Sequence, residues 1–143
     1  MSDRDRACRY ALLSAVAAGA TAVLAKIGVR DIPSNLATAI RTIVILVFAW
    51  GIVFARGESG GLREIKGRSL LFLVLSGIAT GVSWLAYYRA LQLAPASKVA
   101  PIDKLSLPIT VVLAALVLAE PISARLAAGV GLMVIGALLT MGA

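Results

Sequence analysis

The sequence predicts an all-α, polytopic membrane protein that crosses the bilayer about five times. Of the 143 residues, 60% are hydrophobic and only 15% are charged, and the mean hydropathy is +0.96. Soluble domains are about half apolar and about a quarter charged, and a globule of this size keeps much of its surface exposed to water. The apolar residues also form runs of about 20 residues, the length that a helix needs to cross hydrocarbon. Such continuous runs disfavour a β-barrel, whose strands alternate in polarity.

Polar and helix-breaking residues divide the apolar sequence into five spans. A short turn over Arg30–Asn35 follows the first run, and the clearly polar loop Arg56–Arg68 follows the second. Pro95 ends the third run and Glu120–Pro121 ends the fourth, because proline disrupts a helix at its own position. The spans are expected at about residues 8–28, 36–55, 69–91, 97–119 and 123–142, within a single domain of residues 1–143.

The N-terminal segment also resembles a secretory signal peptide. Arg4, Arg6 and Arg9 precede an Ala-rich run that reaches small residues at Ala18–Ala20. The apolar run Ala11–Ala25, together with its flanks, is nevertheless long enough to stay in the membrane. We therefore interpret it as the first spanning helix.

The basic residues flank the spans unevenly, and this bias predicts an orientation. Eight lie on the side that holds the N-terminus, and four lie on the opposite side. Because cytoplasmic loops carry an excess of Lys and Arg, we expect the N-terminus in the cytoplasm and the C-terminus outside, in the inner (cytoplasmic) membrane of the cell. The two sets are Arg4, Arg6, Arg9, Arg56, Arg63, Lys66, Arg68 and Arg125, against Lys26, Arg30, Arg89 and Lys98.

Three charged residues lie well inside the expected spans, away from their ends, where a charge is costly and usually faces a cavity or a partner. Arg41 lies in the second span, and Asp103 and Lys104 lie in the fourth. At about 1.5 Å per residue, all three lie roughly 7–11 Å below the outer ends of their helices, so they can share one layer. One interpretation is a buried ion pair that fixes helix packing. The other is a polar cavity, in which the uncompensated cation attracts an anionic or carboxylate-bearing solute or Asp103 couples transport to protons.

Other residues extend this candidate site. Pro101 and Pro108 free backbone carbonyls in the fourth span, which transporters use to build binding sites, although prolines also kink helices without a function. Trp84 and Tyr88 either line the cavity or belong to an interfacial aromatic belt, and the belt explains Tyr88 at least as well. Lys26 either reaches the lipid headgroups from the end of the first span or contributes to the site.

Glycines at helix-packing spacing mark the third and the last spans. Gly77 and Gly81 form a GxxxG pattern, and Gly129 and Gly136 lie in the last span. In lipid, such positions let helix backbones approach closely. The close approach can occur within one chain or between two chains.

The sequence disfavours an enzyme, a metalloprotein and a nucleic-acid-binding protein. His is absent and Cys8 is the single cysteine, so neither a Cys/His metal site nor an intrachain disulfide can form. Neither a nucleophile paired with a base nor a phosphate-binding glycine loop is visible, and no cofactor is expected. Most basic residues flank the spans, as orientation signals do, so the formal net charge of +7 does not indicate nucleic-acid binding.

Two stretches of the chain resemble a known transporter domain. Tyr88–Ser106, with its Ala-Leu and Pro-Ala-Ser elements, and Leu118–Ser123, with its Glu-Pro stop, are similar to the EamA domain of the drug/metabolite transporter superfamily. The similarity covers nearly the whole chain, and Lys26 late in the first span also fits it. The resemblance implies a five-helix bundle and an exporter of metabolites or drugs.

The resemblance also implies a dimer. Typical members carry two five-helix repeats in inverted orientation, whereas this chain has one. The related four-helix small multidrug resistance proteins form antiparallel dimers through their last helix, a role that would fall here to Gly129 and Gly136. Those relatives carry an essential Glu in the first helix, which this sequence lacks. The charge bias favours a single orientation, so a parallel dimer or a second chain of opposite orientation also fits.

The sequence thus yields one main hypothesis and two alternatives. The main hypothesis is a dimeric solute transporter with Asp103, Lys104, Arg41 and Trp84 around a central polar cavity. In the first alternative, a non-transporting membrane assembly subunit, the charges only fix packing. In the second, a flippase subunit for a lipid-linked sugar, the cavity opens toward lipid.

Overall fold

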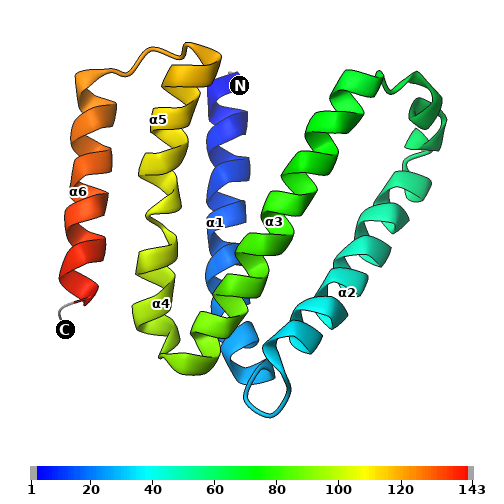
Figure 1. Cartoon of the computed structure of the whole chain (residues 1–143). Coiled ribbons are helices and arrows are strands. Elements are labelled where there is room, and N and C mark those ends of the chain that lie inside the picture. Colours follow the sequence, from blue (N-terminus) through cyan, green and yellow to red (C-terminus); the bar gives the residue numbers. More distant parts are fainter. Residues whose placement is uncertain (1–2, 142–143) are drawn as a thin grey trace. The chain divides into compact units, whose positions relative to one another are not determined.

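Figure 1 shows the protein as a computed structural model that describes residues 3–141, without the side chains of Arg4 and Arg63. Every regular element in this range is a helix: α1 (Asp3–Gly28), α2 (Ser34–Ala55), η1 (Glu58–Glu64), α3 (Gly67–Leu93), α4 (Ala96–Asp103), α5 (Ser106–Leu118) and α6 (Ala124–Met141). Five spans are long and apolar enough to cross a membrane, namely α1, α2, α3, α4 together with α5, and α6. They confirm the predicted fold class. Gly142, the last residue of the fifth expected span, lies outside the described residues.

Contacts between residues divide the chain into two compact units. Unit 1 holds the described residues up to 23 and from 94 onward, and unit 2 holds residues 24–93. Unit 1 therefore contains most of α1 with α4, α5 and α6. Unit 2 contains the last turn of α1 with α2, η1 and α3.

In unit 2, α2 and α3 pack against each other as a helical hairpin (Figure 1). In this unit Thr38 of α2 is buried, as are Tyr88 and Leu91 of α3. At the far end, Gly57 adopts a left-handed conformation with φ of +67°, which glycine reaches without a steric penalty. This turn leads from α2 into the short 3₁₀ helix η1, which packs on α2.

In unit 1, α6 packs against α4 and α5, and Val99 and Ala137 are buried there. The glycines of α6 are not sites of close approach within this unit. A Cβ atom built at Gly129 or Gly136 would meet no other heavy atom within 4 Å. Their small size is therefore not required by the packing of the single chain.

The fourth span is interrupted between α4 and α5, and the interruption lies between the two prolines. The sequence predicted one continuous helix over residues 97–119, but Lys104 and Leu105 form a turn. Pro108 has no N–H to donate to the carbonyl of Lys104, and its ring clashes with that carbonyl in a continuous helix. The Lys104 carbonyl instead accepts from Leu107 at 3.0 Å, and the Leu105 N–H donates to Ile102 at 3.0 Å. These tighter bonds close the turn.

Replacing Pro108 by alanine should join α4 to α5. The new N–H can donate to the Lys104 carbonyl, which adds one helical hydrogen bond. Amide hydrogen exchange across residues 104–107 should slow by about fivefold, the effect of a bond worth roughly 1 kcal/mol. Pro101→Ala is the matched control, because Pro101 already lies within α4. Equal exchange rates in Pro108→Ala and the unmodified protein would contradict this origin of the turn.

Candidate functional site

A polar stripe runs along the first two turns of α2. Ser34, Thr38, Arg41 and Thr42 recur at helical spacing and so lie on one face. The Thr38 hydroxyl donates to the Ser34 carbonyl at 2.9 Å, and the Thr42 hydroxyl donates to the Thr38 carbonyl at 2.8 Å. These bonds satisfy the two threonine donors inside the helix. Arg41 and Ser34 must find their partners elsewhere.

Arg41 stacks on two aromatic side chains of α3. Its guanidinium carbon lies 4.2 Å from the centre of the Trp84 ring and 5.5 Å from the centre of the Tyr88 ring. Trp84 and Tyr88 are four residues apart on α3, so one turn of the helix presents both rings to the same cation. Unit 2 therefore places Arg41, Trp84 and Tyr88 in one cluster, which we call the arginine–aromatic cluster.

The arginine–aromatic cluster leaves a positive charge inside a membrane-spanning hairpin. Arg41 lies about 10 Å along α2 from its first residue. An arginine at the centre of a spanning helix costs about 2.5–3.5 kcal/mol on insertion scales, and a desolvated cation–π contact returns about 2 kcal/mol. Within the described part of unit 2, no carboxylate pairs with Arg41. The Tyr88 side chain is 4% exposed, and its hydroxyl makes no hydrogen bond there either.

A second polar group ties the helix ends of unit 2 together. The Gln92 amide nitrogen donates to the carbonyls of Val29, at 3.2 Å, and Ile32, at 2.8 Å. Its amide oxygen accepts from the guanidinium of Arg89 at 3.0 Å. Lys26 donates to the carbonyl of Leu91, in the last turn of α3, where a cation complements the helix dipole. These bonds hold the α1–α2 turn against the end of α3.

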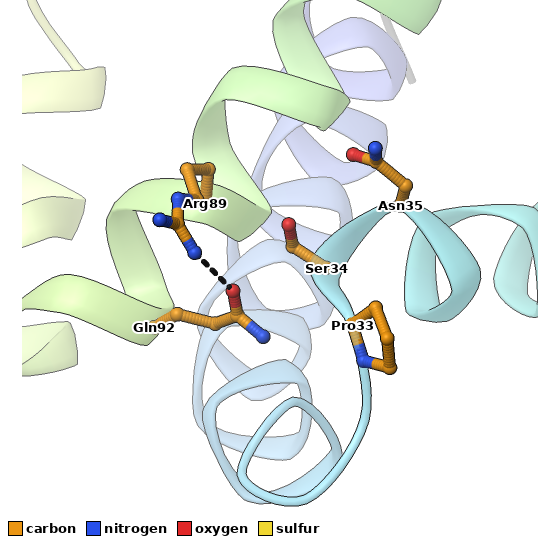
Figure 2. A pocket seen from close by; sticks show the side chains of 5 residues that line it. All are labelled: Pro33, Ser34, Asn35, Arg89 and Gln92. Atoms are coloured by element: carbon orange, nitrogen blue, oxygen red, sulfur yellow. Dashed lines mark hydrogen bonds between the residues drawn. The ribbon is translucent and has the colours of Figure 1, made fainter.

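Two pockets open at this end of unit 2. One has a volume of about 440 Å³ and is shown in Figure 2; its lining residues are Pro33, Ser34, Asn35, Arg89 and Gln92. The other has a volume of about 190 Å³ and is lined by Lys26, Val29, Arg30, Leu91 and Gln92. The charged residues that line the two pockets are all basic.

The remaining predicted site residues belong to unit 1. The Lys104 ammonium lies 3.3 Å from the Asp103 carboxylate, and both side chains are partly exposed. They stand at the turn that separates α4 from α5, with Pro101 before it and Pro108 after it. Gly129 and Gly136 lie on α6. The structure thus brings Arg41, Trp84 and Tyr88 together, places Lys26 at the helix ends of the same unit, and pairs Asp103 with Lys104.

Three residues of unit 2 were absent from the predicted site. Ser34 could have been found, because it starts the stripe that contains Arg41. From the sequence, Arg89 is only a basic residue that flanks a span and helps to indicate the orientation. Gln92 carried no signal, because its partners are backbone carbonyls and the sequence does not say which helix ends meet.

The fold and its five apolar spans define a class: multi-pass α-helical membrane proteins. The chain belongs to the EamA-like transporter family, which matches residues 6–142. It is therefore a membrane transporter, as the sequence predicted.

The comparisons with individual proteins agree with this assignment. The chain is 51% identical, over 130 residues, to a Sinorhizobium protein described as an "Uncharacterized transporter in cobO 3'region". The aligned region covers 91% of this chain and 92% of that relative. No solved structure matches the chain.

Replacing Gln92 by leucine should destabilise unit 2. Leucine has a similar volume but leaves the Val29 and Ile32 carbonyls and the Arg89 guanidinium without this partner. With each hydrogen bond worth about 0.5–1.5 kcal/mol, the thermal unfolding midpoint in detergent should fall by several degrees. Thr80→Val is the control, because its exposed hydroxyl bonds only within α3, to Ser76. Equal midpoints for Gln92→Leu and Thr80→Val would contradict the assigned role.

Proposed function

We propose that the protein exports a small anionic or carboxylate-bearing metabolite or drug, and that the arginine–aromatic cluster binds this solute. The family supplies transport as the general activity. The observation that carries the proposal is Arg41, a cation two turns inside a spanning helix with aromatic rings but no carboxylate of unit 2 beside it. A negative group on the solute would provide the missing countercharge.

The aromatic residues suit the rest of such a solute. Trp84 is partly exposed and offers a flat apolar surface beside the guanidinium. The phenol of Tyr88 can donate a hydrogen bond to an oxygen of the solute, since it has no other acceptor in the described part of unit 2. Large aromatic surfaces with a few polar groups are the usual lining of small-molecule sites.

Asp103 and Lys104, in unit 1, have a separate role in the proposed transport. Their contact at 3.3 Å leaves both side chains partly exposed, so the pair is not a sealed structural ion pair. Intramembrane carboxylates commonly act as proton relays in transporters. We assign Asp103 to the coupling of transport to protons, and Lys104 to the control of the Asp103 carboxylate. Pro101 and Pro108 maintain the turn between α4 and α5 on which both residues lie. Lys26 has a supporting role: its bond to the Leu91 carbonyl holds the last turn of α3, close to Arg89.

We further propose that the transporter works as a homodimer, which supplies the second five-helix repeat. The open space around Gly129 and Gly136 supports this, because the packing of unit 1 does not require glycine at these two positions. A partner α6 could approach closely at both glycines. An antiparallel arrangement would give each transporter two inverted copies of the arginine–aromatic cluster.

Arg41→Gln should reduce export by at least tenfold, because the glutamine cannot supply a charge to the solute. Export is measured as the loss of anionic compounds from expressing cells into the medium, identified by mass spectrometry against cells with an empty vector. Arg41→Lys is the matched variant: it keeps the charge but loses the planar stacking on Trp84, and it should retain part of the activity. The amount of folded protein in the membrane is measured for each variant.

Two results would contradict the proposed solute class. One is unchanged export by Arg41→Gln. The other is a set of exported compounds that are all neutral or cationic. Loss of protein from the membrane in Arg41→Gln, with Arg41→Lys fully stable, would instead favour the structural role of the charge in an assembly subunit.

Antiparallel dimers require insertion in both orientations, which labelling can detect. Cys8 is exposed and is first replaced by serine. A cysteine at Gly60, where a side chain would have open space, then reports the side of the loop after α2. Comparable labelling by a membrane-impermeant maleimide in intact cells and in inverted vesicles supports the antiparallel homodimer. Labelling from the cytoplasmic side alone excludes it.

A further inference from the structure

The pocket at the start of α2 combines several donors and no acid among its five lining residues. It lies wholly within unit 2, between the first residues of α2 and the last turns of α3 (Figure 2). Its volume of about 440 Å³ is ample for a phosphate or carboxylate group together with several water molecules. This pocket is distinct from the arginine–aromatic cluster, because Arg41, Trp84 and Tyr88 do not line it.

Ser34 is a largely buried residue of this pocket, and its hydroxyl has no intramolecular partner among the described residues. The residue is only 7% exposed, and it lies between Asn35 and Arg89 in Figure 2. Its carbonyl is used by Thr38, but its hydroxyl makes no hydrogen bond within the described chain. The accessible part of this residue faces the pocket. The hydroxyl is therefore free to bond a group that enters the pocket.

The backbone beside Ser34 offers further donors. Pro33 precedes α2 and provides no side-chain cap, and the first helical bond is the one from Ala37 to the Pro33 carbonyl at 3.0 Å. The N–H groups of Ser34, Asn35 and Leu36 therefore have no acceptor in their own helix. With the positive end of the dipole of a 22-residue helix, they favour an anion.

Arg89 faces these donors from α3. One of its nitrogens donates to the Gln92 oxygen at 3.0 Å, and Gln92 is itself held by the Val29 and Ile32 carbonyls. Gln92 thus fixes the guanidinium while the other N–H donors of Arg89 have no partner in the described part of unit 2. A guanidinium held by one edge suits an oxyanion, because the remaining donors can bind two oxygens at once.

We infer that the Ser34 hydroxyl, the first N–H groups of α2 and Arg89 form a binding site for an oxyanion, a phosphate or carboxylate group. The oxyanion belongs either to a soluble anion or to the headgroup of an anionic lipid. We assign this site the first contact with an anionic solute on its way to Arg41, and this role rests on the proposed function. Binding itself requires no transport, and it can be measured alone.

The test measures binding of inorganic phosphate to the full-length chain in uncharged detergent, after lipid removal, by isothermal titration calorimetry. Ser34→Ala should weaken binding by about three- to tenfold through the loss of one hydrogen bond. Arg89→Gln should weaken it by at least tenfold through the loss of charge-assisted bonds. Arg30→Gln is the matched control: it removes the same charge from the neighbouring pocket and should change the affinity by less than twofold.

Folding is separable from binding in these variants. Ser34→Ala breaks no cap bond, so the thermal unfolding midpoint without phosphate should stay within about one degree of the unmodified value. Arg89→Lys keeps the charge if Arg89→Gln proves unstable, and it should bind phosphate less tightly because lysine cannot form two parallel bonds.

A second arm identifies the source of the oxyanion. Retention of phosphatidylglycerol by the purified protein is measured by native mass spectrometry. Phosphate binding that falls in Ser34→Ala and Arg89→Gln supports a soluble anion, and phosphatidylglycerol retention that falls in the same variants without phosphate binding supports a lipid headgroup. Absence of binding for both probes, insensitivity to both substitutions, or an equal loss in Arg30→Gln overturns the site. Export that depends on Arg41 while this binding fails would refute the oxyanion site and leave the proposed function standing.

Discussion

Hydrocarbon offers a helix no water, so each polar group inside it needs a partner from the protein or from a ligand. This constraint separates the polar side chains of the hairpin that are satisfied within their own helix from those that are not. Thr38 and Thr42 turn their hydroxyls back onto carbonyls of their own helix. Arg41 cannot do so, and it is placed against Trp84 and Tyr88. The contact offsets only part of the cost of the charge, and the proposed anionic solute would offset the remainder.

The same constraint connects the two polar regions of unit 2. Arg41 lies on the face of α2 that starts with Ser34, and Trp84 and Tyr88 lie on the face of α3 that ends near Arg89 and Gln92. The two polar regions therefore follow each other along the hairpin. An anion held at the start of α2 would be about 10 Å from Arg41 along the helix.

The five spans were predictable because length and hydropathy alone decide whether a helix can cross a bilayer. The turn at Lys104–Leu105 was not predicted, because the fourth span was expected to be one continuous helix. The sequence shows Pro101 and Pro108, but the hydrogen bond lost is four residues before Pro108 and is repaired by a tighter turn. Arg41 was identified as unusual from its position, yet its partners were not, because helical periodicity gives the face of a residue and not the neighbouring helix. A buried ion pair and a polar cavity were both compatible with the sequence.

Gln92 shows how strongly local chemistry can limit sequence drift at a position with no obvious motif. Its amide nitrogen meets two carbonyl oxygens and its amide oxygen meets a guanidinium, so the two ends of the amide cannot exchange. Glutamate has the same shape but would set a carboxylate oxygen against two carbonyl oxygens, and leucine would satisfy none of the three groups. Arg89, by contrast, donates only one of these bonds, and lysine could also donate it. As far as the contacts that hold the helix ends together are concerned, we therefore expect Gln92 to be less replaceable during evolution than Arg89; binding of an oxyanion by Arg89 would be a separate constraint.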